Sequence, residues 1–249
     1  MKAVHLTTDD PIYLPAFYDR LLREKHADTL AVFVVPPLYR AQTPLEAAWR
    51  YARTFGIADT ARLMSRVVGT KLRRQSIASV CARWNVRCEE VADVNAPPFL
   101  DALRAMGPDV LVSVSCPQIF KMPLIELPPR GVLNIHGAIL PHYRGVLPSF
   151  WMLANGEQQA GVTIYFVNEK IDAGDRCGLR VFDILPEDTL DSFLARSKRI
   201  AADLLIEVLV GVERGSAPRE PLNLKEGSYF SWPDREAVRR FRSRGRSVW

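Results

Sequence analysis

Short apolar segments alternate with amphipathic ones along the first 135 residues, and this alternation restricts the fold more than any other feature of the chain. Such segments, rich in β-branched residues, are typical of parallel strands buried on both faces. Strands separated by helices at this spacing predict βαβ units. The chain is therefore expected to form an α/β fold with a Rossmann-like, mostly parallel sheet flanked by helices, with strands near 2–7, 30–35, 87–91, 110–115 and 132–135.

The remaining segments predict one domain with two additions. Residues 38–78 carry aromatic and basic side chains at roughly helical spacing, which indicates a helical insertion whose apolar positions serve packing rather than a cofactor site. After residue 161 the pattern predicts strands at 162–168 and 179–184 and a long amphipathic helix at 188–214. No repeat or low-complexity linker is present. We therefore expect a catalytic domain at 1–214 and a short C-terminal extension at 215–249 that is not an independent domain.

Composition narrows the class of protein without choosing a partner. The net charge of +5 is compatible with anionic partners, and folates, nucleotides and RNA all qualify. The cysteines at 81, 88, 116 and 177 form neither a CxxC pair nor a zinc-type cluster with histidine, so reduced thiols and no metal are expected. No signal-peptide core or bilayer-length apolar run is present, which predicts a cytoplasmic protein without a membrane partner.

Two polar residues of types common in catalytic sites lie at the end of one predicted strand. Asn134 and His136 alternate across Ile135, so on a strand they face the same side. This position is the carboxyl end of a parallel strand, where open α/β sheets form their ligand crevice. An amide and an imidazole side by side there are able to polarise a carbonyl and hold a developing oxyanion.

A second polar segment, 169–175, contains Asp172 beside the small residues Ala173 and Gly174. Small residues let the backbone approach a ligand closely. Asp172 is expected to pair with His136 and to favour its charged form. Together the two segments predict a three-residue catalytic group.

The order of these motifs resembles a known family. The chain contains Asn134-x-His136, then Leu-Pro-x-Tyr-Arg-Gly at 140–145, Gly-Val-Thr at 161–163 and Asp-x-Gly-Asp at 172–175. This set resembles the formyltransferase family, which includes methionyl-tRNA formyltransferases, glycinamide ribonucleotide transformylases and sugar N-formyltransferases. The resemblance covers roughly residues 75–210, and the full set in this order and spacing is highly specific.

The resemblance implies roles for individual residues. Asn134 would hydrogen-bond the formyl oxygen, His136 as imidazolium would stabilise the oxyanion, and Asp172 would hold His136 and accept the amine proton. The co-substrate implied is 10-formyltetrahydrofolate, with no metal. Main chain around two segments would cradle its pterin ring, and the residues concerned are Ser115, Cys116, Pro117, Gln118, Ile119, Phe120, Asn168, Glu169, Lys170, Ile171, Gly174 and Asp175.

The acceptor-binding residues expected are Arg144, Gly145 and Trp151. Arg144 is able either to bind a substrate phosphate or to cap its loop. Trp151 is able to stack on a nucleotide base, but core packing explains it as well. The Arg-rich tail, residues 235–246, is interpreted as a solvated helix end rather than a nucleic-acid contact.

The acceptor itself is expected by exclusion to be a nucleotide-linked amino sugar. The tRNA enzymes usually carry a further C-terminal domain, for which the 35 residues after 214 are too few. The purine enzymes typically have His where this chain has Tyr165, and they lack the insertion. Sugar N-formyltransferases are closest in layout, and family habit suggests a homodimer. A methionyl-tRNA or other small-amine formyltransferase, a 10-formyltetrahydrofolate hydrolase, and a binding module on an inactive scaffold remain alternatives. A nucleotide-binding oxidoreductase is disfavoured, because no GxGxxG follows the first strand.

Overall fold

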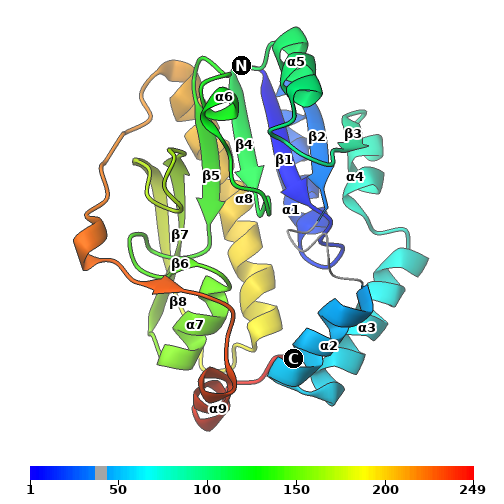
Figure 1. The fold of residues 1–249 in the computed structure, drawn as a ribbon, viewed down its shortest axis with the longest axis vertical. Coiled ribbons are helices and arrows are strands. Elements are labelled where there is room, and N and C mark those ends of the chain that lie inside the picture. The colour runs from blue at the N-terminus through cyan, green and yellow to red at the C-terminus, as the bar shows by residue number, and fades with distance from the viewer. Residues whose placement is uncertain (37–43) are drawn as a thin grey trace.

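The computed structural model describes residues 1–36 and 44–249, and its centre is a seven-stranded sheet with the order β3-β2-β1-β4-β5-β7-β8 (Figure 1). Neighbouring strands from β3 to β5 are parallel, whereas β7 runs antiparallel to β5, and β8 antiparallel to β7. The expected mostly parallel sheet is thus confirmed. The strands are β1 (Ala3–Thr8), β2 (Thr29–Val35), β3 (Arg87–Glu90), β4 (Val110–Val114), β5 (Val132–His136), β7 (Gln159–Phe166) and β8 (Arg176–Asp183).

Helices cover both faces of this sheet. One face packs against α1 (Leu14–Lys25), α4 (Ile77–Arg83) and α8 (Leu190–Arg214). The other packs against α5 (Pro97–Met106) and α6 (Met122–Ile125). The ends follow ordinary capping chemistry, because Ser76 and Thr189 each form a capping box and Gly107 ends α5 in the left-handed conformation. Short 3-10 helices occupy His26–Asp28 and Leu224–Glu226.

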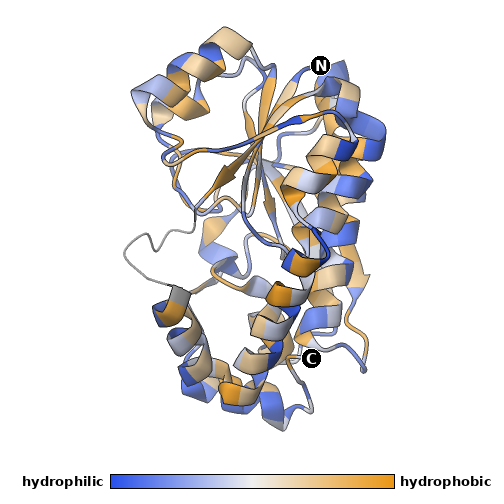
Figure 2. Cartoon of the chain, turned by 90° about the vertical axis from the view of Figure 1, so that its right-hand side faces the viewer, coloured by the Kyte–Doolittle hydropathy of each residue, from blue (hydrophilic) through white to orange (hydrophobic). Residues whose placement is uncertain are grey.

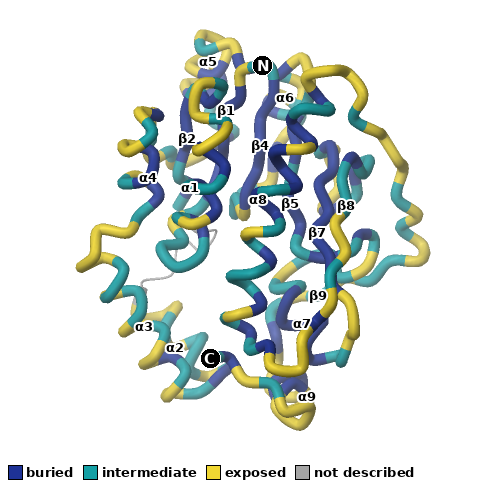
Figure 3. The backbone as a smooth tube through the Cα atoms, turned by 180° about the vertical axis from the view of Figure 1, so that it is seen from behind, coloured by how far each residue is buried: buried dark blue, intermediate teal, exposed yellow. Residues whose placement is uncertain are grey.

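The insertion is helical in its described part, as α2 (Pro44–Phe55) and α3 (Ile57–Leu72). Residues 38–43 of the expected insertion lie outside the described residues. Figure 2 shows α2 and α3 as a helix pair set apart from the sheet, and Figure 3 shows frequent exposed segments along them while the central strands are mostly buried. The pair follows β2, so it lies at the carboxyl end of the parallel strands.

A third apolar cluster joins distant parts of the chain. It contains α7 (Pro148–Asn155), α9 (Arg235–Ser243), Phe55 of α2 and Phe193 of α8. Phe55 is 1% exposed and meets Phe150 edge to face with ring centroids 5.6 Å apart. The C-terminal extension therefore shares a core with both the insertion and the long helix.

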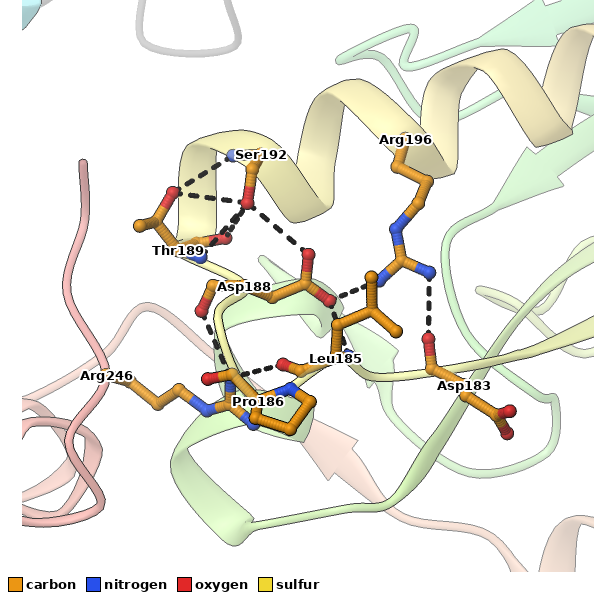
Figure 4. Close-up of polar contacts among 8 residues, drawn as sticks. All are labelled: Asp183, Leu185, Pro186, Asp188, Thr189, Ser192, Arg196 and Arg246. Carbon is orange, nitrogen blue, oxygen red and sulfur yellow. Dashed lines mark hydrogen bonds and ion pairs between the residues drawn. The ribbon is translucent and has the colours of Figure 1, made fainter.

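Polar contacts hold the extension in place as well. The guanidinium of Arg246 donates to the carbonyls of Leu185 and Pro186 at 2.7 and 2.9 Å and to that of Asp188 (Figure 4). The buried Asp188 carboxylate pairs with Arg196 and accepts from the Leu185 N–H at 2.8 Å. Arg244 similarly donates to the Ala154 carbonyl at 3.0 Å. These arginines thus contact main chain within the protein, whereas Arg235, Arg239 and Arg240 are exposed.

No helix in the described residues is long and apolar enough to cross a membrane. Across residues 1–36 and 44–249, no group of three or more His, Cys, Asp and Glu side chains is placed to hold a metal ion. All four cysteines are free.

Candidate active site

The carboxyl end of β5 brings Asn134 and His136 together with a neighbouring strand. The antiparallel register places Asn134 opposite Tyr165, and His136 opposite Thr163. Asn134 donates through Nδ2 to the Tyr165 hydroxyl at 2.8 Å. The hydroxyl in turn donates to Asp172 Oδ1 at 2.9 Å. Tyr165 is therefore a bridge between the amide of β5 and the carboxylate of the 168–175 turn.

Three groups converge on the Asp172 carboxylate. Besides the Tyr165 hydroxyl, the backbone N–H of Gly145 donates to Oδ2 at 2.9 Å, and Nδ1 of His136 lies 3.6 Å from Oδ1. Asp172 is 8% exposed and has a left-handed φ of 49°, which turns its side chain back toward β5. The carboxylate is thus buried but surrounded by donors, as a buried anion requires.

Both nitrogens of His136 face oxygen acceptors. Nε2 lies 2.7 Å from the carbonyl oxygen of Tyr143, opposite the Nδ1 contact with Asp172. A carbonyl only accepts, so Nε2 carries a proton in this arrangement. A second proton on Nδ1 would face the carboxylate. The ring is 6% exposed and lies behind Asn134 and Asp172 rather than at the cavity surface.

The Tyr165 hydroxyl is a hydrogen-bond donor, and its pKa lies above the usual value of a phenol. Burial, together with the negative charge and hydrogen bond of Asp172, raises the pKa of Tyr165 well above its usual value. The hydroxyl therefore stays protonated at neutral pH, and it orients the Asn134 amide and the Asp172 carboxylate at the same time.

The loop after β5 is held by the C-terminal extension. Residues Arg144–Gly145 form the short strand β6, which pairs in parallel with β9 (Tyr229–Phe230). At Gly145, with φ 96°, an added Cβ would lie 2.2 Å from the Phe230 carbonyl oxygen, so only glycine permits this approach. Because the Gly145 N–H also binds Asp172, the extension helps to position the carboxylate.

A cavity of about 310 Å³ opens beside these residues. Its walls come from the ends of β4 and β5, the 116–120 and 167–172 segments, and the β6–β9 contact. The lining residues are Ser113, Cys116, Pro117, Gln118, Ile119, Phe120, Asn134, Gly145, Val146, Tyr165, Val167, Asn168, Glu169, Lys170, Ile171, Asp172 and Tyr229.

Two side-chain amides on the cavity wall form hydrogen bonds with nearby backbone groups. Gln118 accepts from the Val94 N–H and donates to the Ala92 carbonyl, both at 2.8 Å. Asn168 accepts from the Lys170 N–H at 2.9 Å and donates to the Ala173 carbonyl at 3.1 Å. These side chains fix the two loops on either side of the cavity, which leaves the loop main chain to meet a ligand.

Several residues expected at the site lie elsewhere. Ser115 accepts from Lys198 Nζ at 2.7 Å and does not line the cavity. The missing side chain of Gly174 makes room for protein, since a Cβ there would lie 1.7 Å from the Phe166 carbonyl oxygen. The Asp175 carbonyl accepts from the Phe166 N–H at 2.9 Å. Gly174 and Asp175 therefore close the turn against β7.

The two large acceptor-binding candidates also lie off the cavity wall. Trp151 is 8% exposed, stacks on Phe230 with centroids 4.7 Å apart, and donates to the Ser231 carbonyl. Its ring is core, because the extension covers it. Arg144 lies over the Tyr229 ring at 6.0 Å, and its Nε is buried without a hydrogen-bond partner in the described residues.

Five lining residues were not expected from the sequence: Ser113, Val146, Tyr165, Val167 and Tyr229. Val146 and Val167 directly flank expected segments. Tyr165 and Tyr229 required the β5–β7 register and the β6–β9 pairing, which sequence patterns do not specify. Cys116 lines the cavity, and burial raises the pKa of its thiol to about 11, so it remains a neutral thiol.

Comparison with known proteins shows the family of the chain. Residues 1–209 match the model of a family described as formyl transferase. Curated relatives include the methionyl-tRNA formyltransferases of Trichlorobacter lovleyi, 29% identical over 73% of this chain and 60% of that protein, and of Clostridioides difficile, 32% identical over 65% and 52%. The chain thus spans about half to three-fifths of their length.

Solved structures share the fold at low identity. A sugar N-formyltransferase from a Shewanella species has a TM-score of 0.59 at 20% identity, covering 93% of this chain and 77% of that one. Glycinamide ribonucleotide transformylase 1 from Symbiobacterium toebii has a TM-score of 0.60 at 16% identity, covering 90% and 95%. A Helicobacter canadensis N-formyltransferase, solved with folinic acid and dTDP-3-aminofucose, has a TM-score of 0.60 at 16% identity, covering 93% and 71%.

Proposed function

The chain belongs to the formyl transferase family, and on that premise we propose that it transfers a formyl group from 10-formyltetrahydrofolate to a primary amine. The observation that carries the proposal is the single hydrogen-bonded group formed by Asn134, Tyr165 and Asp172, with His136 behind it, at the wall of one cavity. The family match supports the reaction type, and the geometry supports the assignment of roles.

The lining of the cavity supports its assignment to the folate co-substrate. Apolar walls at Phe120 and Val167 suit a flat ring system, and the clamped 116–120 and 168–172 loops offer main-chain donors and acceptors to its polar edge. Ile119 and Ile171 are 62% and 47% exposed at the lining, which a bound ring would cover. The formyl group would then lie toward Asn134.

The transfer needs one bond formed and one broken at the formyl carbon. The amine nitrogen attacks this carbon, and the carbonyl electron pair moves onto oxygen. One N–H of the Asn134 amide donates a hydrogen bond to the Tyr165 hydroxyl, and its second N–H is able to stabilise this oxyanion. Collapse of the intermediate re-forms the carbonyl and breaks the bond to the folate nitrogen, which takes up the proton that Asp172 accepted from the amine, directly or through water. Orientation of the two reactants in one cavity lowers the entropic cost.

Asp172 and His136 manage the protons. The carboxylate lines the cavity and accepts the amine proton, directly or through water. In this geometry His136 acts on the reactants by way of the Asp172 carboxylate, because both of its ring nitrogens face protein oxygens. A protonated His136 therefore balances the carboxylate and stabilises the intermediate electrostatically, with direct contact to the oxyanion requiring a rotation of its ring.

The acceptor is proposed to be a nucleotide-linked amino sugar. The proposal is supported by solved proteins of the same fold, which include sugar N-formyltransferases. Methionyl-tRNA is the second candidate, since the curated relatives are enzymes of that kind.

The test follows tetrahydrofolate release from 10-formyltetrahydrofolate. Parallel reactions contain no acceptor, UDP-, GDP- or TDP-linked amino sugars, glycinamide ribonucleotide, or methionyl-tRNA. Release with an amino sugar alone supports the full proposal. Release with methionyl-tRNA alone replaces the sugar by the second candidate. Release without any amine means a hydrolase, and it would contradict amine transfer.

A further inference from the structure

Helices α2 and α3 carry an apolar surface that the other described residues leave exposed. Six of the twelve large apolar side chains that are exposed in the described residues belong to these two helices. They are Leu45, Trp49, Ile57, Met64, Val68 and Leu72. Ile57 and Leu72 are 78% and 80% exposed. Such a concentration marks an interaction surface, since single exposed apolar residues are common but clusters are rare.

Helical geometry gathers these residues into stripes. On α3 the positions 57, 64, 68 and 72 follow the seven- and four-residue spacing of one helix face. On α2 the positions 45 and 49 are four apart and share a face, whereas Phe55 points into the shared core. The exposed face is therefore separate from the face that holds α2 to the protein.

The side of α3 that contacts the protein is mixed in character. Leu63 and Val67 are half-buried. Arg66 pairs with Asp191, and the Arg62 and Arg66 guanidiniums lie 5.8 and 5.1 Å from the Trp249 ring centre. Thr60 is its one residue classed as buried. The Ile57/Met64/Val68/Leu72 stripe nevertheless stays exposed, which lowers solubility unless something covers it.

Charge indicates what covers it. Residues 44–74 contain seven Lys and Arg against two Asp and Glu, a net charge of +5, which equals that of the whole chain. Arg53, Lys71, Arg73 and Arg74 are exposed and make no ion pair with any described residue. A helix with an exposed apolar stripe, a tryptophan and flanking cations matches an anionic lipid surface, where apolar side chains enter the headgroup region and cations meet lipid phosphates.

We propose that α2 and α3 dock this protein on an anionic membrane surface, with the Leu45/Trp49 and Ile57/Met64/Val68/Leu72 stripes inserted at the interface. No spanning helix is needed, because an interfacial helix lies in the plane of the membrane. The expectation of no membrane partner considered only spanning segments and targeting signals, so it did not address this mode.

The docked surface is mechanically linked to the catalytic cavity. Trp232, three residues after the cavity-lining Tyr229, donates through Nε1 to the Thr54 hydroxyl of α2 at 3.0 Å. Arg242 of α9 donates to the Phe55 carbonyl and pairs with Asp59 at 3.2 Å. These contacts join the proposed docking surface to the segment that lines the cavity, at the same end of the sheet. The inference itself does not depend on the proposed reaction, because its test measures lipid binding alone.

The test is co-sedimentation of the full chain with vesicles of phosphatidylcholine containing 30% phosphatidylglycerol, and with vesicles of phosphatidylcholine alone. We expect at least tenfold tighter binding to the anionic vesicles at ~0.1 M salt than at ~0.5 M, since screening weakens charge attraction. The double variant Ile57→Ser/Leu72→Ser should lose at least tenfold in affinity. Its matched control, Val181→Ser/Leu185→Ser, changes exposed apolar residues elsewhere and should bind as the unaltered chain does.

Two further measurements localise the contact. Arg53→Gln/Lys71→Gln should weaken binding more than Arg199→Gln/Lys225→Gln, which removes the same charge from other exposed positions. Vesicles should shift the tryptophan emission to shorter wavelength, and Trp49→Phe should abolish most of that shift. Equal affinity for both vesicle types, or no difference between the α2–α3 variants and their controls, would overturn the proposal. So would sedimentation equilibrium showing that the stripes join two copies of the chain instead.

Discussion

The sheet and the α2–α3 pair depart from the usual burial pattern in opposite directions. The sheet end buries polar groups, including His136, Tyr165 and Asp172, while the helix pair exposes apolar ones, including Leu45 and Ile57. A buried polar group needs a hydrogen-bond partner to avoid a loss of stability, whereas a cluster of exposed apolar side chains needs a covering contact to avoid aggregation. At the sheet end the contacts are internal hydrogen bonds. On the helix pair they are absent from the described residues, so a partner must supply them.

This difference explains why the two regions support different kinds of conclusion. The polar group at the sheet end is complete within one chain, so its geometry can be interpreted as chemistry. The exposed stripes are half of an interface, so only their composition and charge indicate the other half. Four predictions test the contrast, from the largest expected effect to the smallest.

The anchor that holds α2 to the protein should matter most. Phe55→Ala removes a ring that is 1% exposed, and it should lower the free energy of unfolding by about 3–5 kcal/mol. Met64→Ala on the outward stripe should change it by less than about 0.5 kcal/mol. Urea denaturation of both variants measures this, and similar losses would mean that the stripe is covered within the chain.

A buried histidine in the sheet should make stability depend on pH. His5 is fully buried, and desolvation lowers its pKa to about 4, below the 6.5 of an exposed imidazole. The folded state therefore resists protonation, so stability is full above about pH 6.5 and falls as pH drops toward 4, by up to about 3 kcal/mol. His5→Leu should flatten the stability profile in this window. An unchanged slope would assign the effect to other groups.

The bridging tyrosine should affect both stability and rate. Tyr165→Phe leaves Asn134 Nδ2 and Asp172 Oδ1 without the hydroxyl, at a cost of about 1–3 kcal/mol. Because Tyr165 acts as a positioning residue, the Tyr165→Phe substitution should lower kcat by a larger factor than it raises the KM for folate. Tyr51→Phe is the matched control, because Tyr51 does not line the cavity. Equal effects on kcat in the two variants would remove the positioning role.

Replacing a glycine by alanine should affect stability in opposite directions in the two regions. An added Cβ at Gly69 of α3 meets nothing within 4 Å, so Gly69→Ala should raise stability by about 1 kcal/mol. The same change at Gly174, where the Cβ would meet the Phe166 carbonyl oxygen, should instead disrupt the turn that carries Asp172. Thermal melting of both variants should therefore show shifts of opposite sign.

Local patterns predicted much of this structure. Apolar segments identified the parallel strands β1, β2, β4 and β5 within one or two residues, and the alternation across Ile135 correctly placed Asn134 and His136 on one end of β5. The second half was harder, because β7 and β8 start three residues before the expected positions and run antiparallel to their neighbours. That direction depends on packing between distant segments.

The same limit applies to the site. The role of Tyr165 follows from its register with Asn134, and that of Tyr229 follows from a two-residue strand pairing across more than eighty positions. Neither has a local signal. Trp151 shows the converse, because an aromatic residue near the motif suggested a ligand contact and tertiary packing placed it in a core.

The most direct test of the central claim is the rate of formyl transfer in Asn134→Ala at saturating 10-formyltetrahydrofolate, measured with the acceptor that supports turnover. Loss of the amide donor should lower the rate about 10²–10³-fold, as for other oxyanion holes, while folate affinity changes little. A rate within about threefold of the unaltered protein, with folate binding intact, would contradict the assignment of this site to oxyanion stabilisation.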